Sequence, residues 1–130
     1  MKPILIYVSH PYGGDLQNVV QLRSICRELA KKYPDCLFIP AAAITCREYR
    51  EDRYMDDLEL LVDLMLRCDA VYFPMKAASV SFGVHIETTI AADYDMPLFT
   101  TERGLAAFIL EHRLEAEKAP SAATDKGPGK

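Results

Sequence analysis

The sequence predicts one α/β domain with a three-layer, Rossmann-like (flavodoxin-like) fold and a parallel sheet of four or five strands. Two observations predict it: short apolar runs alternate with longer amphipathic segments, and turn residues bound each apolar run. Apolar runs of this kind are typical of strands buried on both faces. Strands that alternate with helices form right-handed crossovers onto a parallel sheet. The 130 residues suit one domain, expected over 1–118, with a polar tail at 119–130 that is rich in Pro and Gly and is expected to be disordered.

The first half of the chain predicts two strands and two helices. The run ILIYV at 4–8 is continuously apolar and predicts the first strand. A helix is expected over 16–33, capped by Asp15, because apolar residues recur at helical spacing until a proline follows. The run CLFI at 36–39 predicts the second strand. After a loop, the broad apolar pattern of 55–67 predicts a helix that is buried on two sides, against the sheet and against a partner subunit.

The second half repeats the alternation. The run DAVYFP at 69–74 predicts the third strand, and a helix is expected over 82–94. A short apolar run at 96–100 predicts the fourth strand, and 102–118 predicts a last helix with His112 on its apolar stripe. Because parallel sheets bind ligands beyond the carboxyl ends of their strands, we expect the function in the loops after the first three strands.

Composition excludes several classes of function. The formal net charge is −4, whereas proteins that coat nucleic acid or anionic membranes need a basic surface. No run approaches the roughly 20 apolar residues of a membrane helix, and the apolar start of the chain is too short for an export signal, so a cytoplasmic location is expected. The four cysteines form no CxxC pair; Cys26 and Cys68 fit core positions, and no metal or redox site is predicted.

The first candidate site is the segment SFGVHIE at 81–87. Ser81 and Gly83 open a helix directly after a buried strand, where a hydroxyl and exposed amides make an anion site. Glu87 follows within two turns and can face the same crevice. The alternative is an ordinary helix start, with Ser81 as the N-cap and Glu87 complementing the helix dipole.

The second candidate is the turn YVSHPYGGD at 7–15, with Asn18 one turn later. Its glycines allow the backbone to approach a ligand, and Tyr7 lies near the carboxyl end of the strand, where its hydroxyl can touch a catalytic carboxylate. The segment is neither a Walker A loop nor a GxGxxG fingerprint, because the Lys-Ser/Thr pair and the second spaced glycine are missing. By itself it also fits a tight strand-to-helix turn.

Together, IYVSHPYGG with Asn18, the strand CDAVYF and the element SFGVHIE resemble the nucleoside 2-deoxyribosyltransferase-like superfamily. The resemblance is nearest to its short bacterial and phage members, which carry an SHPYGG-type turn and an S-x-G-x-x-x-E element. It covers about residues 3–100.

The resemblance implies a role for each matching residue. Glu87 matches the glutamate that attacks the anomeric carbon, and Tyr7 matches the tyrosine that positions it. The implied phosphate site is Ser81, Gly83 and Val84. The implied sugar and base site is Ser9, His10, Gly13 and Gly14, and Asn18 of the same motif is a further candidate for substrate or phosphate binding. The chemistry is that of a retaining glycosidase acting on a nucleoside or its 5′-monophosphate, and it needs no metal or organic cofactor.

One position departs from the resemblance. Relatives carry an aspartate eight residues before the aspartate that opens the third strand, and here that position is Leu61. Asp57 or Asp63 can substitute only if the helix is shifted. Loss of the acid that protonates the leaving base would lower the rate by roughly 10²- to 10⁴-fold. A nucleotide sensor that binds without turnover is therefore the alternative function, and a structural dimer without a ligand is a third.

Other polar residues carry weaker expectations. His10 is a candidate base or phosphate donor, whereas His85 is expected on the surface or at an interface because it is only two residues from Glu87 on the helix. Arg47 or Arg50 can reach over the site as a phosphate clamp. The expected partners are a small nucleoside or nucleotide and, through the 55–67 helix, another copy in a homodimer or larger homo-oligomer.

Overall fold

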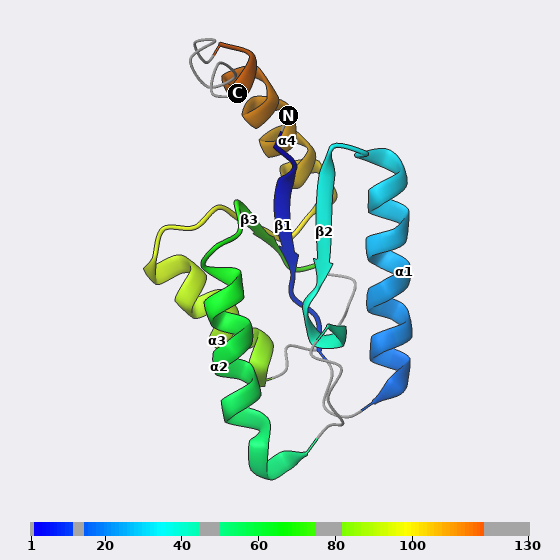
Figure 1. Cartoon of the computed structure of the whole chain (residues 1–130), viewed down its shortest axis with the longest axis vertical. Helices are drawn as coiled ribbons and strands as arrows, with labels where there is room; N and C mark the ends of the chain where they lie inside the picture. The colour runs from blue at the N-terminus through cyan, green and yellow to red at the C-terminus, as the bar shows by residue number, and fades with distance from the viewer. Residues whose placement is uncertain (1, 12–14, 45–49, 75–81, 119–130) are drawn as a thin grey trace, which may run out of the picture.

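The computed structural model describes residues 2–11, 15–44, 50–74 and 82–118. Over these ranges the chain is an α/β domain whose four-stranded, all-parallel sheet has helices on both faces (Figure 1). The three-layer, Rossmann-like class expected from the sequence is therefore confirmed. The expected disordered tail lies outside the described residues.

The sheet has the strand order β2-β1-β3-β4. Its strands are β1 (Ile4–Val8), β2 (Cys36–Pro40), β3 (Ala70–Tyr72) and β4 (Leu98–Phe99). The chain leaves β1 toward β2 on one side and continues from β3 to β4 on the other. The strand order thus switches between β1 and β3, which is where open α/β sheets bind ligands.

The last two strands are shorter than the sequence predicts, because prolines lacking an N–H interrupt the ladder. Pro74 ends the pairing of β3, and Pro97 precedes β4. Hydrogen bonding still extends to Phe73, whose amide donates to the Phe99 carbonyl at 2.8 Å. At the other end, the Asp69 carboxylate accepts from the Leu5 amide at 2.8 Å, which secures the start of β3 against β1.

The helices lie close to their expected positions. They are α1 (Leu16–Lys32), α2 (Tyr54–Met65), α3 (Phe82–Asp93) and α4 (Glu102–Lys118), with short 3₁₀ turns at Ala41–Ala43 and Glu51–Arg53. The Asp15 carboxylate caps α1 by accepting from the Gln17 amide at 2.9 Å, as its sequence predicts. None of the helices in the described ranges is both long and apolar enough to cross a membrane.

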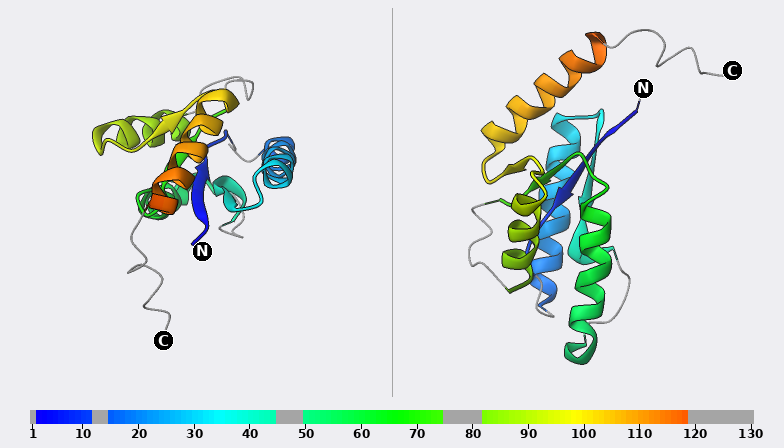
Figure 2. Two further views of the ribbon diagram at one scale, coloured as in Figure 1. Left: turned by 90° about the horizontal axis from the view of Figure 1, so that it is seen from above. Right: turned by 90° about the vertical axis from the view of Figure 1, so that its left-hand side faces the viewer.

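The hydrophobic core has one part on each face of the sheet, and the alternation of β1 assigns its side chains to them. Ile4, Ile6 and Val8 pack with α1 and α4, whereas Tyr7 packs with α2 and α3. Figure 2 shows α1 on the side of the strands opposite to α2 and α3. The odd-numbered positions of β1 therefore point toward the helix that carries Glu87.

Candidate active site

The site centres on a buried carboxylate that the fold surrounds with hydroxyl donors. Glu87 lies in the second turn of α3 and is almost completely buried. The Tyr7 hydroxyl donates to Oε2 of Glu87, and the Ser9 hydroxyl donates to Oε1 at 2.7 Å. Tyr7 and Ser9 are themselves fully buried. A carboxylate that accepts two side-chain hydrogen bonds in this setting has a fixed orientation, with lone pairs left for a reacting atom.

The two donors reach Glu87 because they stand two residues apart on an extended chain. Side chains at i and i+2 of a strand point to the same face. Tyr7 in β1 and Ser9 just after it therefore both face α3. The Ser9 amide donates to the Tyr72 carbonyl at 2.9 Å, so the backbone stays in register with β3 as far as Ser9. The two donors therefore lie at the end of β1, where the strand order switches between β1 and β3, and the acceptor Glu87 lies on α3.

Burial determines the protonation states of Glu87 and Tyr7. Desolvation raises the pKa of Glu87, and the hydrogen bonds from Tyr7 and Ser9 oppose that rise without cancelling it. The pKa of Tyr7 is also raised, first by burial and then by the nearby charge of Glu87. Tyr7 therefore keeps its proton and acts as a donor, and Glu87 is a more basic carboxylate than one in water.

A tyrosine of α2, Tyr54, packs against the first turn of α3. A Cβ added at Gly83 would lie 2.3 Å from the Tyr54 hydroxyl and 3.8 Å from Cδ1 of Leu58. Glycine at this position therefore lets Tyr54 and Leu58 of α2 pack directly on the α3 backbone. Gly83 and Glu87 are four residues apart and share one face of the helix. Tyr54 thus lies beside the same helix face as the carboxylate, one turn away.

The residues of α2 divide between the site and the core. Leu61, at the position where the resemblance implies an acid, packs against the core part that contains Tyr7 and Met65. Asp57 is partly buried and adjoins Leu58 in sequence, so its side chain leaves the helix about 100° away from the contact with Gly83. Of the two substitutes, Asp57 lies in the turns that contact α3, whereas Asp63 is exposed.

His10 points to the opposite side of the sheet, as the alternation after Ser9 requires. Its Nδ1 donates to the Pro11 carbonyl at 2.8 Å, and its Nε2 lies 3.2 Å from the amide oxygen of Gln21 in α1. The ring is buried, and both nitrogens have protein partners. The structure thus places His10 as a link between the turn and α1, on the face away from Glu87.

The remaining expected positions are partly outside the described residues. Gly13, Gly14, Ser81 and Arg47 fall there, so their expected roles stay predictions. The described ones are Gly83 and Val84 in the buried first turn of α3, Asn18 in the first turn of α1, and the exposed His85. Arg50 pairs with Asp52 at 2.8 Å. The histidine of α4, His112, packs against Phe108 with ring centroids 5.6 Å apart.

Two further features bear on the chemistry. Within the described ranges, no three His, Cys, Asp or Glu side chains are grouped so that they can hold a metal ion.

A cleft of about 530 Å³ opens between α1 and the start of α4, lined in part by Gln21, Tyr72 and Glu102. Glu87 does not line that cleft, which lies on the His10 side of the sheet.

Sequence reasoning missed two contacts that define the site. Ser9, which the resemblance implies in the sugar and base site, is buried and donates to Glu87, a contact that the sequence analysis does not predict. If the alternation of side chains along β1 is extended by one residue beyond Val8, Ser9 points to the same side of the sheet as Tyr7, toward α3. The approach of Tyr54 to Gly83 has no local signal, because 29 positions separate the two residues along the chain and only packing joins them.

Comparison with known proteins adds no relative. No family model, no curated protein and no solved structure matches this chain.

Proposed function

We propose that the chain is an N-glycosidase or deoxyribosyltransferase that acts on a nucleoside or nucleoside 5′-monophosphate through Glu87. The observation that supports this proposal is the buried Glu87 carboxylate, held at the β1–β3 switch by hydroxyl donors on both of its oxygens. A surface glutamate that only complements a helix dipole needs neither burial nor two donors. The resemblance of the motifs that carry Tyr7 and Glu87 points to the same chemistry.

In the proposed reaction a Glu87 oxygen attacks the anomeric carbon of the sugar. The new C–O bond forms as the C–N bond to the base breaks, and the base leaves with that electron pair and takes a proton. Water or a second base then attacks the same carbon, breaks the ester and frees the carboxylate. Tyr7 and Ser9 orient the carboxylate, and the raised pKa of Glu87 makes it a stronger nucleophile once it is ionised. The proposed proton donor to the leaving base is Asp57, which lies in the part of α2 that packs on α3.

A chromatographic screen for released base tests the proposal, with nucleosides and 5′-monophosphates as substrates in the presence and absence of an acceptor base. Glu87→Ala is expected to abolish release, and Tyr7→Phe to lower kcat/KM by roughly 10- to 100-fold, because one hydrogen bond to the reacting carboxylate is lost. The matched control is Glu111→Gln, which changes an exposed glutamate of α4. A glycosyl adduct on the peptide that contains Glu87, seen by mass spectrometry, would identify the nucleophile.

The second candidate is a nucleotide-binding sensor without turnover. The observation that favours it is Leu61, which packs into the core where the resemblance implies an acid. Calorimetric titration with the same nucleotides separates the two functions. Binding without base release in any reaction supports the sensor, and release that disappears in Glu87→Ala excludes it.

A further inference from the structure

Among the helices that the structure describes, none covers one part of the sheet. Leu5 is paired with Leu37 and Tyr7 with Ile39, so these four residues share the face of the sheet that α2 and α3 cover. Tyr7 is completely buried there, whereas the side chain of Leu37 is 53% exposed and Leu5 and Ile39 are half-buried. The described helices α2 and α3 therefore cover the β3 side of this face and leave the β2 side open. We call Leu5, Leu37 and Ile39 the apolar β2 face.

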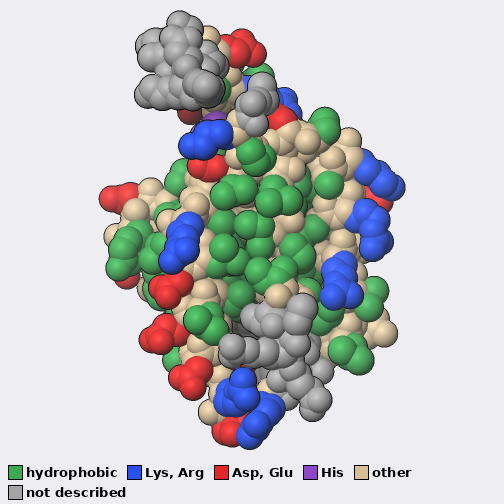
Figure 3. Space-filling model, in the orientation of Figure 1, with side chains coloured by type: hydrophobic (Ala, Val, Ile, Leu, Met, Phe, Trp, Pro, Cys, Tyr) green, Lys and Arg blue, Asp and Glu red, His purple; other side chains and the backbone are tan. Residues whose placement is uncertain are grey.

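The apolar β2 face is part of a larger hydrophobic surface. Figure 3 shows hydrophobic side chains gathered between α1 and α2 across the side of the molecule where β1 and β2 lie. Monomeric proteins seldom expose a broad, contiguous apolar patch, and a patch rimmed by polar residues is typical of a protein interface. An edge strand with an open face also needs protection from uncontrolled pairing.

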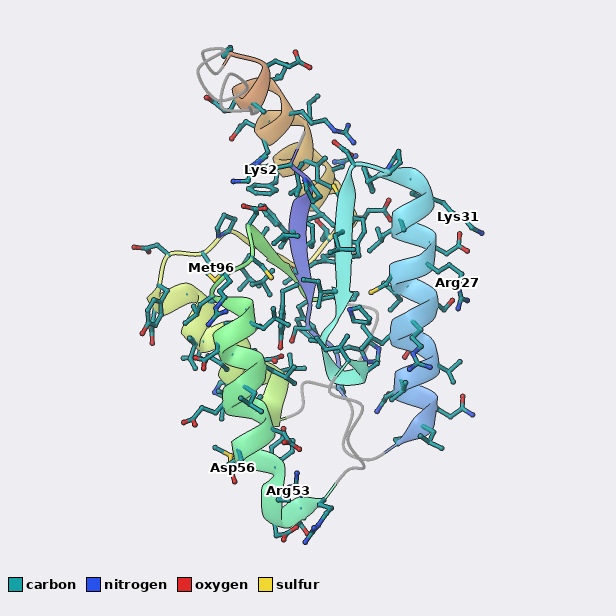
Figure 4. All side chains as sticks on the ribbon, viewed as in Figure 1. Lys2, Arg27, Lys31, Arg53, Asp56 and Met96 are labelled. Atoms are coloured by element: carbon teal, nitrogen blue, oxygen red, sulfur yellow. The ribbon has the colours of Figure 1, made fainter. Side chains whose placement is uncertain are left out.

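Charges of opposite sign flank this surface. The basic stripe lies on α1, where residues spaced by four share one side of the helix: Arg23, Arg27 and Lys31. The acidic stripe lies on α2, with spacings of three and four: Asp56, Glu59 and Asp63. All six side chains are exposed, and Arg67 follows after the acidic stripe ends. Figure 4 labels Arg27 and Lys31 on one flank and Asp56 on the other.

Within the part of the chain that the structure describes, ion pairs neutralise almost none of this charge. Among the described residues, one ion pair involves a residue of either stripe: Lys31 pairs with Glu28 at 3.4 Å, exposed to solvent. The stripes therefore present a basic edge and an acidic edge on either side of an apolar centre. Two copies of this surface are therefore complementary in charge, because the basic edge of one can lie against the acidic edge of the other.

We propose that the apolar β2 face binds a second copy of this chain, in a dimer whose two-fold axis runs parallel to β1 through the centre of the face. Rotation about that axis exchanges the flanks, so the basic stripe of each copy lies against the acidic stripe of the other. An axis within the face but perpendicular to β1 would place basic against basic and acidic against acidic. Complementary flanks select the parallel axis and oppose the other arrangement.

Charge reversal tests this geometry by sedimentation analysis of the full chain over a range of concentrations. One variant makes the α1 stripe acidic (Arg23→Glu, Arg27→Glu, Lys31→Glu) and the other makes the α2 stripe basic (Asp56→Lys, Glu59→Lys, Asp63→Lys). Wild type is expected to dimerise, and each variant alone to dimerise at least about tenfold more weakly, because like charges then face each other at both rims. An equimolar mixture of the two variants is expected to form a heterodimer, since opposite stripes face each other again.

A matched pair of substitutions separates the apolar face from general charge attraction. Leu37→Lys places a charge in the centre of the face, at a position where an edge strand tolerates it. Introduced into the wild type, or into both variants of the mixture, it is expected to abolish dimerisation. Leu110→Lys changes a leucine of α4 with a similar exposure of 56% and is expected to leave both unchanged. Unaltered circular dichroism would show that the variants fold. A wild type that stays monomeric at its highest soluble concentration, or a mixture that associates equally with Leu37→Lys, overturns the proposal.

Discussion

The protonation of Glu87 can be tested through stability alone, before any substrate is known. Burial raises the pKa of Glu87 above its ordinary value of 4.5, because desolvation outweighs the hydrogen bonds from Tyr7 and Ser9. Between 4.5 and the raised pKa, the folded chain holds a proton that the unfolded chain has released. The free energy of unfolding of the wild type therefore falls as pH rises through this interval. Glu87→Gln removes the titration and keeps the shape of the side chain, and the Tyr7 hydroxyl can turn to accept from the new amide.

The expected difference has a definite size and sign. Glu87→Gln is expected to gain stability over wild type by up to about 1.4 kcal/mol per pH unit within the interval, and to keep that gain at higher pH. Below pH 4.5 both side chains are neutral, and the two proteins should have nearly equal stability. Urea denaturation in half-unit steps of pH measures the difference, with Glu111→Gln as an exposed control that should show no comparable dependence. A difference that does not vary with pH, or one that favours the wild type as pH rises, would refute the dominance of burial.

Two other predictions concern packing and charge. Gly83→Ala should destabilise the chain by about 1–3 kcal/mol, because the new Cβ meets the Tyr54 hydroxyl. In a Tyr54→Phe background the nearest ring atom lies at an ordinary 3.5 Å from that Cβ. There the same change should instead stabilise the chain by about 0.5–1 kcal/mol, because alanine has the higher helix propensity. Equal effects in both backgrounds, measured by a double-mutant cycle, would contradict the contact. Arg113→Met should cost about 1 kcal/mol at neutral pH by removing the paired hydrogen bonds that join α4 to Asp35. Since Arg113 lowers the pKa of Asp35, this loss should shrink as pH falls from the ordinary value of 3.8 toward the lowered pKa and disappear below that pKa. A loss that persists at still lower pH would argue for packing instead.

The sequence by itself determined the fold class and most of the elements, because those depend on local patterns. Continuous apolar runs marked β1 and β2, and helical periodicity with an Asp15 cap marked α1 almost to the residue. It also placed Tyr7 at the carboxyl end of a strand and Glu87 on the helix after the third strand, so that their contact could be expected. The strands predicted at 69–74 and 96–100 are shorter in the structure, since prolines and neighbouring strands decide where pairing stops.

Tertiary structure decided the partners. Which helix faces which side of the sheet depends on crossover packing, and this turned His10 toward α1 and Ser9 toward Glu87. The approach of Tyr54 to Gly83 and the open β2 side of the sheet likewise involve residues far apart in the chain. Local propensity carries no information about such pairs, because they exist only once the layers have packed. The burial that raises the pKa of Glu87 arises in the same way, because residues far from it in the sequence, Tyr7 and Ser9 among them, surround it in the fold.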